Sequence, residues 1–376
     1  MINKQSIQVH KKLKGKIEIK SKAPLKTKKD LSIFYTPGVG AVSSYLAKNK
    51  KETRGMTIKN NTVAVVSDGS AVLGLGNIGP EGAIPVMEGK AMIFKEFANV
   101  DAFPIVLTTQ DPEEIIKTVQ YIEPVFGGIN LEDISAPRCF EIERRLKELL
   151  DIPVFHDDQH GTAIVVLAGL INAFKVAKKN FSDGKFVVVG AGAAGIAIAN
   201  LLLLHGAGDI LLLDSKGIIF KSREDLNPFK KQMAEKTNKE NINGGLDEAM
   251  KSADAVIGVS APGIIKAEHI QSMAEKAIVF ALSNPVPEIM PDIAKKAGAF
   301  ITATGRSDFP NQINNALVFP GIFRGALDKK VRQITDNMKI SAAKKLAALV
   351  KKPAPDKIIP SVFDKQVAKT VASAIK

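Results

Sequence analysis

The stretch Phe186-Val-Val-Val-Gly190-Ala-Gly-Ala-Ala-Gly195 decides the fold, and a run rich in alanine, isoleucine and leucine follows it. The apolar residues 186–189 predict a buried strand, and residues 193–205 predict a helix that opens at the glycine-rich turn. Glycines at this spacing let the backbone approach a pyrophosphate at the N-terminus of a helix. Asp214 ends the next predicted strand, residues 210–214, where a carboxylate can accept hydrogen bonds from a ribose. The stretch therefore predicts a dinucleotide-binding unit in preference to a plain tight turn.

The segments around this unit extend the same pattern. A predicted helix, residues 162–178, precedes it, and further buried strands are predicted at residues 255–259, 277–282 and 299–302. Strands and helices that alternate in this way predict a parallel, doubly wound α/β sheet. Two amphipathic helical stretches, residues 323–350 and 361–375, follow the last of these strands.

The first part of the chain has a different rhythm. Short strand-like runs, residues 63–66 and 103–107, alternate with glycine- and proline-rich turns, and helices are predicted at residues 111–121 and 136–150. We therefore predict two domains. Residues 1–158 form an N-terminal α/β domain, and residues 159–376 form a Rossmann-like, doubly wound dinucleotide-binding domain with C-terminal helices.

A second glycine motif, Gly74, Gly76 and Gly79, has the same spacing but a different context. It follows a Ser-Asp-Gly-Ser turn, runs into Pro80, and no strand that ends in an acid follows at the required distance. We therefore reject it as a cofactor fingerprint. It predicts a loop that approaches the substrate or another backbone segment closely.

The composition excludes several classes of protein. The formal net charge is +13, but only eight of the 52 basic residues are arginine, and neither zinc-finger spacing nor an aromatic RNA-binding motif is present. We therefore expect no nucleic-acid partner. The longest apolar runs fall short of the roughly 20 residues that span a bilayer, so no membrane role is expected. A single cysteine, Cys139, and lysines without a following apolar signal segment predict a cytoplasmic protein.

Two pairs of adjacent acids, Glu132-Asp133 and Asp157-Asp158, form the strongest chemical signal outside the glycine turn. Adjacent carboxylates repel each other unless a cation lies between them. They could be solvated loop charges or helix-end acids, or they could converge on a hard cation such as Mg²⁺ or Mn²⁺. His156 and His160 flank the second pair, but the partners of familiar zinc sites are missing, so we interpret both as orienting or core histidines.

Lys90 and Tyr35 are less distinctive by themselves. Lys90 follows the apolar segment Pro85-Val-Met-Glu-Gly, where a partly buried lysine near carboxylates can act as a base. Most lysines are surface charges, and this alternative stays open. Tyr35 precedes a Thr-Pro-Gly turn and could equally be a half-buried aromatic residue whose hydroxyl is hydrogen-bonded.

Taken together, these segments resemble the malic enzyme family, and more narrowly its short bacterial form. The resemblance runs in the family's order from Tyr35 to Arg324. Its blocks are Tyr35-Thr-Pro-Gly-Val, Ser67-Asp-Gly-Ser-Ala-Val-Leu-Gly-Leu-Gly-Asn-Ile-Gly, Ile84-Pro-Val-Met-Glu-Gly-Lys, Asn130-Leu-Glu-Asp, Phe155-His-Asp-Asp-Gln-His-Gly-Thr-Ala, Ser283-Asn-Pro and Asn314-Asn-Ala-Leu-Val-Phe-Pro-Gly.

The resemblance implies a role for each matching residue. Glu132, Asp133 and Asp158 would bind the metal, and Lys90, paired with Asp157, would be the general base. Tyr35 would be the general acid that protonates the enol carbon. Ser70 is a further candidate for the substrate, because Ala71 stands where animal members carry a malate-binding arginine. Asn284 and Asn315 match positions that hold the substrate carboxylates. The positions that match the cofactor site are Gly190, Gly192, Ala193, Ala194, Gly195, Asp214, Ser215, Lys216 and Asn284.

The implied activity is the metal-dependent oxidative decarboxylation of (S)-malate to pyruvate and CO2 by a homodimer. Asp214 favours NAD as the cofactor, and Lys216 leaves NADP possible. The magnesium or manganese ion would act as a Lewis acid. Two alternatives remain at this point: a malolactic enzyme that converts malate to lactate, and a nicotinamide-binding sensor without turnover.

Overall fold

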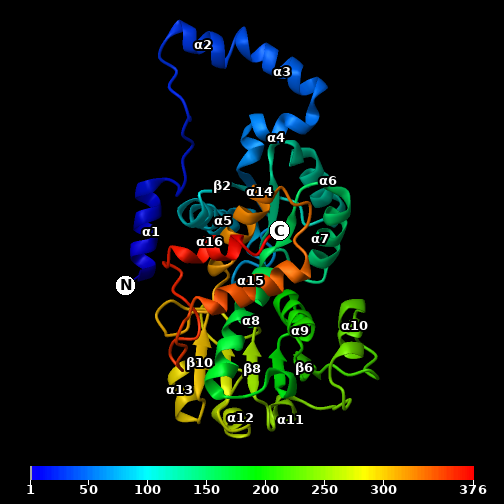
Figure 1. Cartoon of the computed structure of the whole chain (residues 1–376). Coiled ribbons are helices and arrows are strands. Elements are labelled where there is room, and N and C mark those ends of the chain that lie inside the picture. Colours follow the sequence, from blue (N-terminus) through cyan, green and yellow to red (C-terminus); the bar gives the residue numbers. More distant parts are fainter. Residues whose placement is uncertain (1) are drawn as a thin grey trace.

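A computed structural model of the chain describes residues 2–376, which contain two separate sheets (Figure 1). The first sheet is parallel and has the order β2-β1-β3-β4. Its strands are β1 (Thr62–Ser67), β2 (Asp101–Val106), β3 (Gly128–Leu131) and β4 (Val154–His156). The runs predicted at residues 63–66 and 103–107 overlap the two longer strands, β1 and β2.

The second sheet has the order β10-β9-β8-β5-β6-β7, and only its edge strand β7 is antiparallel among the described strands. Its strands are β5 (Lys185–Val189), β6 (Asp209–Asp214), β7 (Gly217–Ile218), β8 (Ala255–Gly258), β9 (Ile278–Ala281) and β10 (Ile301–Thr304). The chain leaves β5 for β6 on one side and returns to β8 on the other. The strand order therefore reverses beside β5, and such a reversal opens a crevice at the carboxyl ends of the strands.

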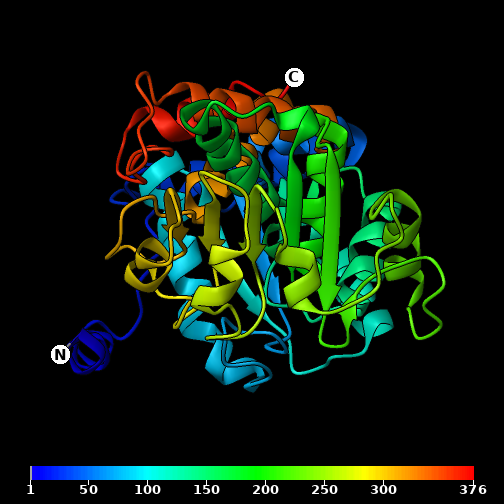
Figure 2. The ribbon, with the colours of Figure 1, turned by 90° about the horizontal axis from the view of Figure 1, so that it is seen from below.

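Helices cover both faces of the second sheet (Figure 2), which confirms the doubly wound α/β fold. Phe186 and Val188 belong to the core shared with α8 (Asp157–Ala177) and α9 (Ala193–His205), whereas Val187 and Val189 belong to a separate core. This alternation is the two-residue period of a strand. The second core is closed by α11 (Leu246–Met250), α12 (Ala267–Gln271) and α13 (Pro291–Lys296).

The helix α5 (Gly79–Ala98) was not predicted from the sequence. Pro80 occupies its first turn, where the missing N–H of proline is harmless, but Pro85 lies inside the helix and breaks the usual pattern. Tertiary packing compensates, because α5 packs against β2 and buries Met87, Lys90 and Phe94.

Other helix boundaries differ from the predictions in two places. The helix α8 begins at Asp157 and not at residue 162, so both acids of the second pair lie in its first turn. The predicted helix at residues 323–350 is divided into two helices, and the first of them packs against α5 beside the four-stranded sheet. Further helices are α4 (Thr53–Met56), α6 (Pro112–Ile122), α7 (Arg138–Leu149), α10 (Pro228–Lys236), α14 (Phe319–Lys329), α15 (Asp336–Ala348) and α16 (Gln366–Ala372).

The N-terminal helices α1 (Ile2–Leu13), α2 (Lys28–Phe34) and α3 (Gly38–Lys48) bury no residue. The segment formed by α2 and α3, which we call the arm, projects away from the two sheets (Figure 1). It nevertheless carries several exposed apolar side chains, among them Leu31, Ile33, Phe34 and Val42. Exposed apolar clusters of this kind mark interaction surfaces.

The helix α8 is long and apolar enough to cross a membrane when judged by length and composition. However, 72% of its most apolar window is buried inside the protein, where the helix packs mainly against α9 and α15. This burial is typical of a central core helix.

Candidate active site

Lys90 lies at the centre of a buried cluster of charges. The cluster forms at the carboxyl ends of two neighbouring strands, because Glu132 follows β3 and Asp157 follows β4. The Lys90 Nζ atom lies 2.6 Å from Glu132 Oε1 and 2.5 Å from Asp157 Oδ2, and 4.3 Å from the centre of the Phe319 ring. Only 7% of Lys90 is exposed. Lys90 is therefore a buried group of the site, and the surface-charge alternative is wrong.

Opposing effects act on the Lys90 ammonium. Burial lowers its pKa, but the carboxylates of Asp157 and Glu132 outweigh burial and raise the pKa above its ordinary value. Burial also raises the pKa of Asp157 to about 7, although Lys90 acts in the opposite direction. The carboxylates therefore keep Lys90 protonated. For Lys90 to act as a base, its pKa would have to fall, which requires that one of these carboxylates no longer pairs with it.

Glu132, Asp133 and Asp158 converge beside Lys90. One oxygen from each carboxylate lies within 4.8 Å of the other two. Burial, followed by repulsion from Asp158, raises the pKa of Glu132 to about 7 and that of Asp133 to about 9. Asp133 Oδ2 is buried and has no hydrogen-bond partner among the described residues. This oxygen-only donor set, with one orphaned oxygen, fits a hard divalent cation.

The local backbone explains why these acids meet. Asp133 has a left-handed conformation (φ 54°), and its N–H donates to Asp158 Oδ2 over 2.7 Å. Asn130 donates to Glu132 Oε2 over 2.9 Å and so fixes the second oxygen of that side chain. Gly161 leaves room for the Asp157 carboxylate, because a Cβ atom at position 161 would lie 1.8 Å from Asp157 Oδ1.

Of the two predicted substrate-binding asparagines, Asn284 lies on a loop and Asn315 begins the short 3-10 helix Asn315–Leu317. A Cβ atom at Gly161 would lie 3.3 Å from Asn315 Cβ, which places Asn315 beside the first turn of α8. A Cβ atom at Gly74 would lie 1.9 Å from the backbone oxygen of Asn284. The second glycine motif therefore permits close approach to another backbone segment, as predicted.

Ser70 makes two hydrogen bonds within the protein. Its hydroxyl donates to Asp68 Oδ1 over 2.5 Å and accepts from the N–H of Ser135 over 2.9 Å. The hydroxyl thus joins two loops, and its contact with substrate stays a prediction. Arg138, which the sequence analysis overlooked, pairs with the buried Asp68 at 2.9 Å, and no motif signals it.

The glycine-rich turn has the geometry that a dinucleotide needs. Gly190 has a φ of +116°, and a Cβ atom there would lie 2.4 Å from the Val259 oxygen. A Cβ atom at Gly195 would lie 1.7 Å from the Gly190 oxygen, so these two glycines allow the turn to close. No heavy atom lies within 4 Å of a Cβ atom at Gly192, which leaves the N-terminus of α9 open for a ligand. Ala193 and Ala194 form the first turn of α9.

Asp214 carries two cationic partners that sequence analysis missed. Lys230 Nζ lies 2.5 Å from Asp214 Oδ2, and Arg223 contacts the same carboxylate at 2.8 Å. Ser215 and Lys216 are exposed in the following turn, where the Lys216 ammonium pairs with Asp225 at 2.8 Å. Arg223 and Lys230 therefore compensate the negative charge of Asp214 at the end of β6. Lys216, which we expected to be available for a cofactor phosphate, is paired with Asp225.

Tyr35 does not join the cluster within this chain. It ends α2 on the arm, 66% of its side chain is exposed, and the arm stands apart from both sheets. Tyr35 therefore lies away from Lys90 of its own chain, and its role as the general acid stays a prediction.

The two histidines behave as core residues. The His156 ring is fully buried, and burial lowers its pKa. His160 Nε2 lies 2.9 Å from Glu143 Oε2, outside the cluster of Glu132, Asp133 and Asp158. These positions agree with the interpretation of both histidines as orienting or core residues.

Comparison with known proteins agrees with this geometry. The family profile described as "Malic enzyme, NAD binding domain" matches residues 159–376, and the profile "Malic enzyme, N-terminal domain" matches residues 14–147. The chain is 57% identical to an NAD-dependent malic enzyme of Geobacillus stearothermophilus over 363 residues, which cover 96% of this chain and 76% of that one. It is 52% identical to a bifunctional malic/malolactic enzyme of Bacillus subtilis, with 100% and 92% of the two chains covered.

A solved structure gives the same result. The crystal structure of an NAD-dependent malic enzyme from Thermotoga maritima superimposes with a TM-score of 0.96 and 50% identity, and 98% of each chain is covered. Both halves of the chain match the corresponding halves of these proteins. The paired sheets, the buried lysine with its acids and the glycine turn thus have one common explanation: the chain belongs to the malic enzyme family.

Proposed function

We propose that this chain oxidises (S)-malate with NAD and releases pyruvate and CO2. The observation that carries the proposal is the buried Lys90 ammonium between Asp157 and Glu132, next to three converging carboxylates. A sensor without turnover would not need a lysine buried among acids, since burying unpaired or marginally paired charges is unfavourable. Lactate formation is the alternative outcome, and the Bacillus subtilis relative combines both names.

The residues of the site fit a divalent cation, Mg²⁺ or Mn²⁺. Glu132, Asp133 and Asp158 would hold it, because their oxygens are close together and Asp133 Oδ2 is unpartnered. When bound, the cation supplies Lewis-acid stabilisation of the enolate oxygen, and the nicotinamide supplies the acceptor for hydride.

The chain's own residues supply the proton transfers. Commitment of Glu132 to a cation would remove one of the carboxylates that raise the pKa of Lys90. The amine of Lys90 could then take the malate hydroxyl proton, while Asp157 holds the side chain in place at 2.5 Å. Asn284 and Asn315 would orient the substrate carboxylates. Tyr35 would deliver a proton to the enol carbon.

The decisive test of this function is the formation of NADH, followed by its absorbance, with malate, NAD and Mn²⁺. We expect NADH and pyruvate to form in equal amounts, and EDTA to abolish the reaction until Mn²⁺ is added in excess. Lactate without net NADH would instead support malolactic activity. Binding of NAD without any product would support the sensor.

Metal binding should also be visible without turnover. In the absence of malate, free Mn²⁺ at 100 times its Kd should raise the free energy of unfolding by about 2.7 kcal/mol, because it binds only the folded site. Asp158→Asn should lose most of this effect in thermal unfolding, whereas Asp254→Asn should retain it, because Asp254 precedes β8 and accepts from Lys179 and Lys185 outside the acid cluster. Equal stabilisation of both variants would remove Asp158 from the metal site.

The cofactor preference follows from the charges around Asp214. We expect NAD to be preferred and NADP to be usable, because Arg223 and Lys230 offset the carboxylate that would repel a 2′-phosphate. Lys230→Ala should lower kcat/KM for NADP about tenfold more than for NAD, the effect of one lost contact to a charged group. Lys216→Ala is the comparison variant, because its ammonium pairs with Asp225 and not with Asp214. An unchanged cofactor ratio in Lys230→Ala would contradict this account.

The exposed arm supports a homodimer. Tyr35, Phe34 and Ile33 are exposed on a segment that packs against neither sheet of its own chain. A second copy would cover this apolar surface and could receive Tyr35 in its site. We also propose that the enzyme works in the cytoplasm, since its single cysteine is buried and unpaired.

A further inference from the structure

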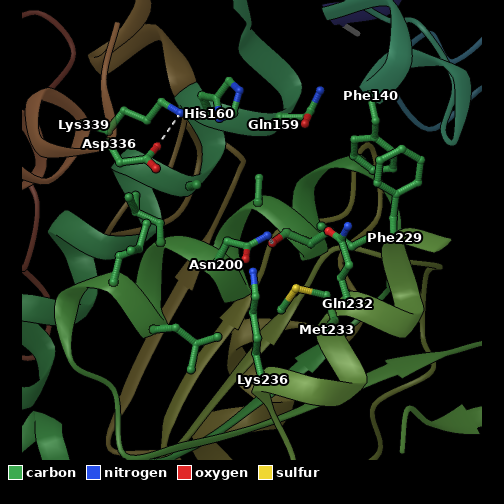
Figure 3. A pocket seen from close by; sticks show the side chains of 16 residues that line it. Phe140, Gln159, His160, Asn200, Phe229, Gln232, Met233, Lys236, Asp336 and Lys339 are labelled. Carbon is green, nitrogen blue, oxygen red and sulfur yellow. Dashed lines mark hydrogen bonds and ion pairs between the residues drawn. The ribbon is translucent and has the colours of Figure 1, made fainter. Parts of the chain in front are cut away.

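Glu288 is an unusual buried charge among the described residues. Other buried charges outside the Lys90 cluster have partners of opposite sign: Lys339 pairs with Asp336 at 2.9 Å (Figure 3), and Glu143 pairs with Lys147 at 2.8 Å. Glu288 is fully buried, but it forms no ion pair with any residue between positions 2 and 376. Burial of a carboxylate without a cation is unfavourable, so its hydrogen bonds have to compensate for the lost hydration.

The Glu288 carboxylate joins the loops that follow two neighbouring strands of the second sheet. Its Oε1 atom accepts from the N–H of Ser260 over 2.7 Å, and its Oε2 atom accepts from the N–H of Ser283 over 3.0 Å. Ser260 lies just beyond β8, and Ser283 lies just beyond β9. Gly258 leaves room for the carboxylate, because a Cβ atom at position 258 would lie 2.6 Å from Glu288 Cδ. One side chain thus fixes the spacing of the two loops.

Each of these loops reaches a part of the proposed cofactor site. A Cβ atom at Gly190 would lie 3.0 Å from Ser260 Cβ, so the first loop packs against the glycine-rich turn. Asn284, a predicted contact of the cofactor and the substrate, directly follows Ser283. A dinucleotide lies across the two halves of such a sheet, with its adenosine near Asp214 and its nicotinamide near the strands beyond the reversal. Glu288 therefore links the pyrophosphate turn to the nicotinamide end of the crevice.

We propose that Glu288 is a positioning residue that sets the place of Asn284 relative to the glycine-rich turn, and thereby the place of the nicotinamide. This role rests on the proposed use of a nicotinamide dinucleotide. Glu288 is buried and acts only through the N–H groups of Ser260 and Ser283. A carboxylate suits this role because both of its oxygens accept hydrogen bonds, whereas an amide offers one oxygen and one donor group.

The outer parts of the same loops are held independently of this side chain. The N–H of Gly263 donates to the Pro287 oxygen over 3.2 Å, and the N–H of Ile265 donates to the Glu288 backbone oxygen over 3.1 Å. Glu288→Gln should therefore fold. In this variant, one of the two N–H groups at the crevice would face an amide NH₂ group instead of an acceptor, and the loops would be held less firmly there.

Calorimetric titrations of the full-length protein with NADH and with ADP-ribose test the proposal. ADP-ribose contains the adenosine and the pyrophosphate but no nicotinamide. Glu288→Gln should weaken NADH binding about tenfold, because binding would then also have to order the loop that carries Asn284. Its affinity for ADP-ribose should stay within about twofold of wild type. Glu268→Gln, an exposed position on α12, is the matched control and should bind both ligands like wild type.

Gly258→Ala is an independent second variant. Its Cβ atom would displace the Glu288 carboxylate, so the same selective loss of NADH affinity is expected while Glu288 itself is intact. Mn²⁺ should raise the unfolding midpoint of both variants as much as that of wild type, because the acids that would hold it lie outside these loops.

A role limited to stability would lower the unfolding midpoint without changing the ratio of the two affinities. Unchanged binding of both ligands, or equal weakening of both, in Glu288→Gln and Gly258→Ala would therefore overturn the proposal. The titrations need no turnover, so they test Glu288 even if the product is lactate. Failure of the wild-type protein to bind NADH would instead refute the proposed function itself.

Discussion

Replacing Lys90 with arginine is expected to lower kcat for malate oxidation about 10³-fold, which lies within the contribution of one general base. Arginine preserves the positive charge that Asp157 and Glu132 require, but it does not lose its proton at accessible pH. The variant therefore separates proton transfer from charge pairing. Initial rates of NADH formation at saturating malate and Mn²⁺ give the measurement.

Lys90→Ala is the companion variant. It should be equally inactive, but its free energy of unfolding should also be about 3–5 kcal/mol lower than that of the wild type. The reason is that two buried carboxylates lose the ammonium group that pairs with them. Thermal unfolding would therefore distinguish the two variants. A Lys90→Arg enzyme with turnover close to that of wild type would refute the general-base assignment, whatever its stability.

A mixed dimer of two inactive variants is expected to recover activity if Tyr35 acts across the subunit interface. Tyr35→Phe and Lys90→Arg should each be nearly inactive as homodimers. In a heterodimer, the subunit with intact Lys90 would receive intact Tyr35 from its partner, so one of the two sites would be complete. Random reassociation of equal amounts should then restore about a quarter of wild-type activity, because half of the dimers are mixed.

The control for this experiment is a mixture in which both chains carry the same substitution. Such mixtures should stay inactive after unfolding and reassociation. If Tyr35 served its own chain, the heterodimer would contain no complete site and the mixture would also stay inactive. Tyr35→Phe homodimers with normal malate turnover would instead remove Tyr35 from catalysis altogether.

The sequence predicted the second sheet better than the rest of the molecule. The helix predicted at residues 193–205 coincides with α9, because the glycine turn fixes its start and an uninterrupted apolar run continues it. Lys90 was harder to place, since the helix that carries it contains Pro85 and several glycines and is stabilised by tertiary packing. Local propensity alone does not report such packing.

The candidate site shows the same limit. The adjacent acid pairs Glu132-Asp133 and Asp157-Asp158 stand out in the sequence. The structure brings Glu132, Asp133 and Asp158 together. Arg223 and Lys230 had no comparable signal, because they reach Asp214 from a loop and a helix beyond the recognisable motif. The arm that carries Tyr35 gave no signal for another reason: contacts that a second chain would provide leave no periodic pattern in the sequence of the first.

The helix α8 has a mechanical consequence. Its first turn carries Asp157 and Asp158, while its apolar length is buried beneath the dinucleotide-binding sheet. Glu132, in contrast, directly follows β3 in the other sheet. An ion held by Glu132, Asp133 and Asp158 would tie the end of β3 to the first turn of α8, so that binding of the ion and the placement of malate relative to the nicotinamide would be coupled through this one helix.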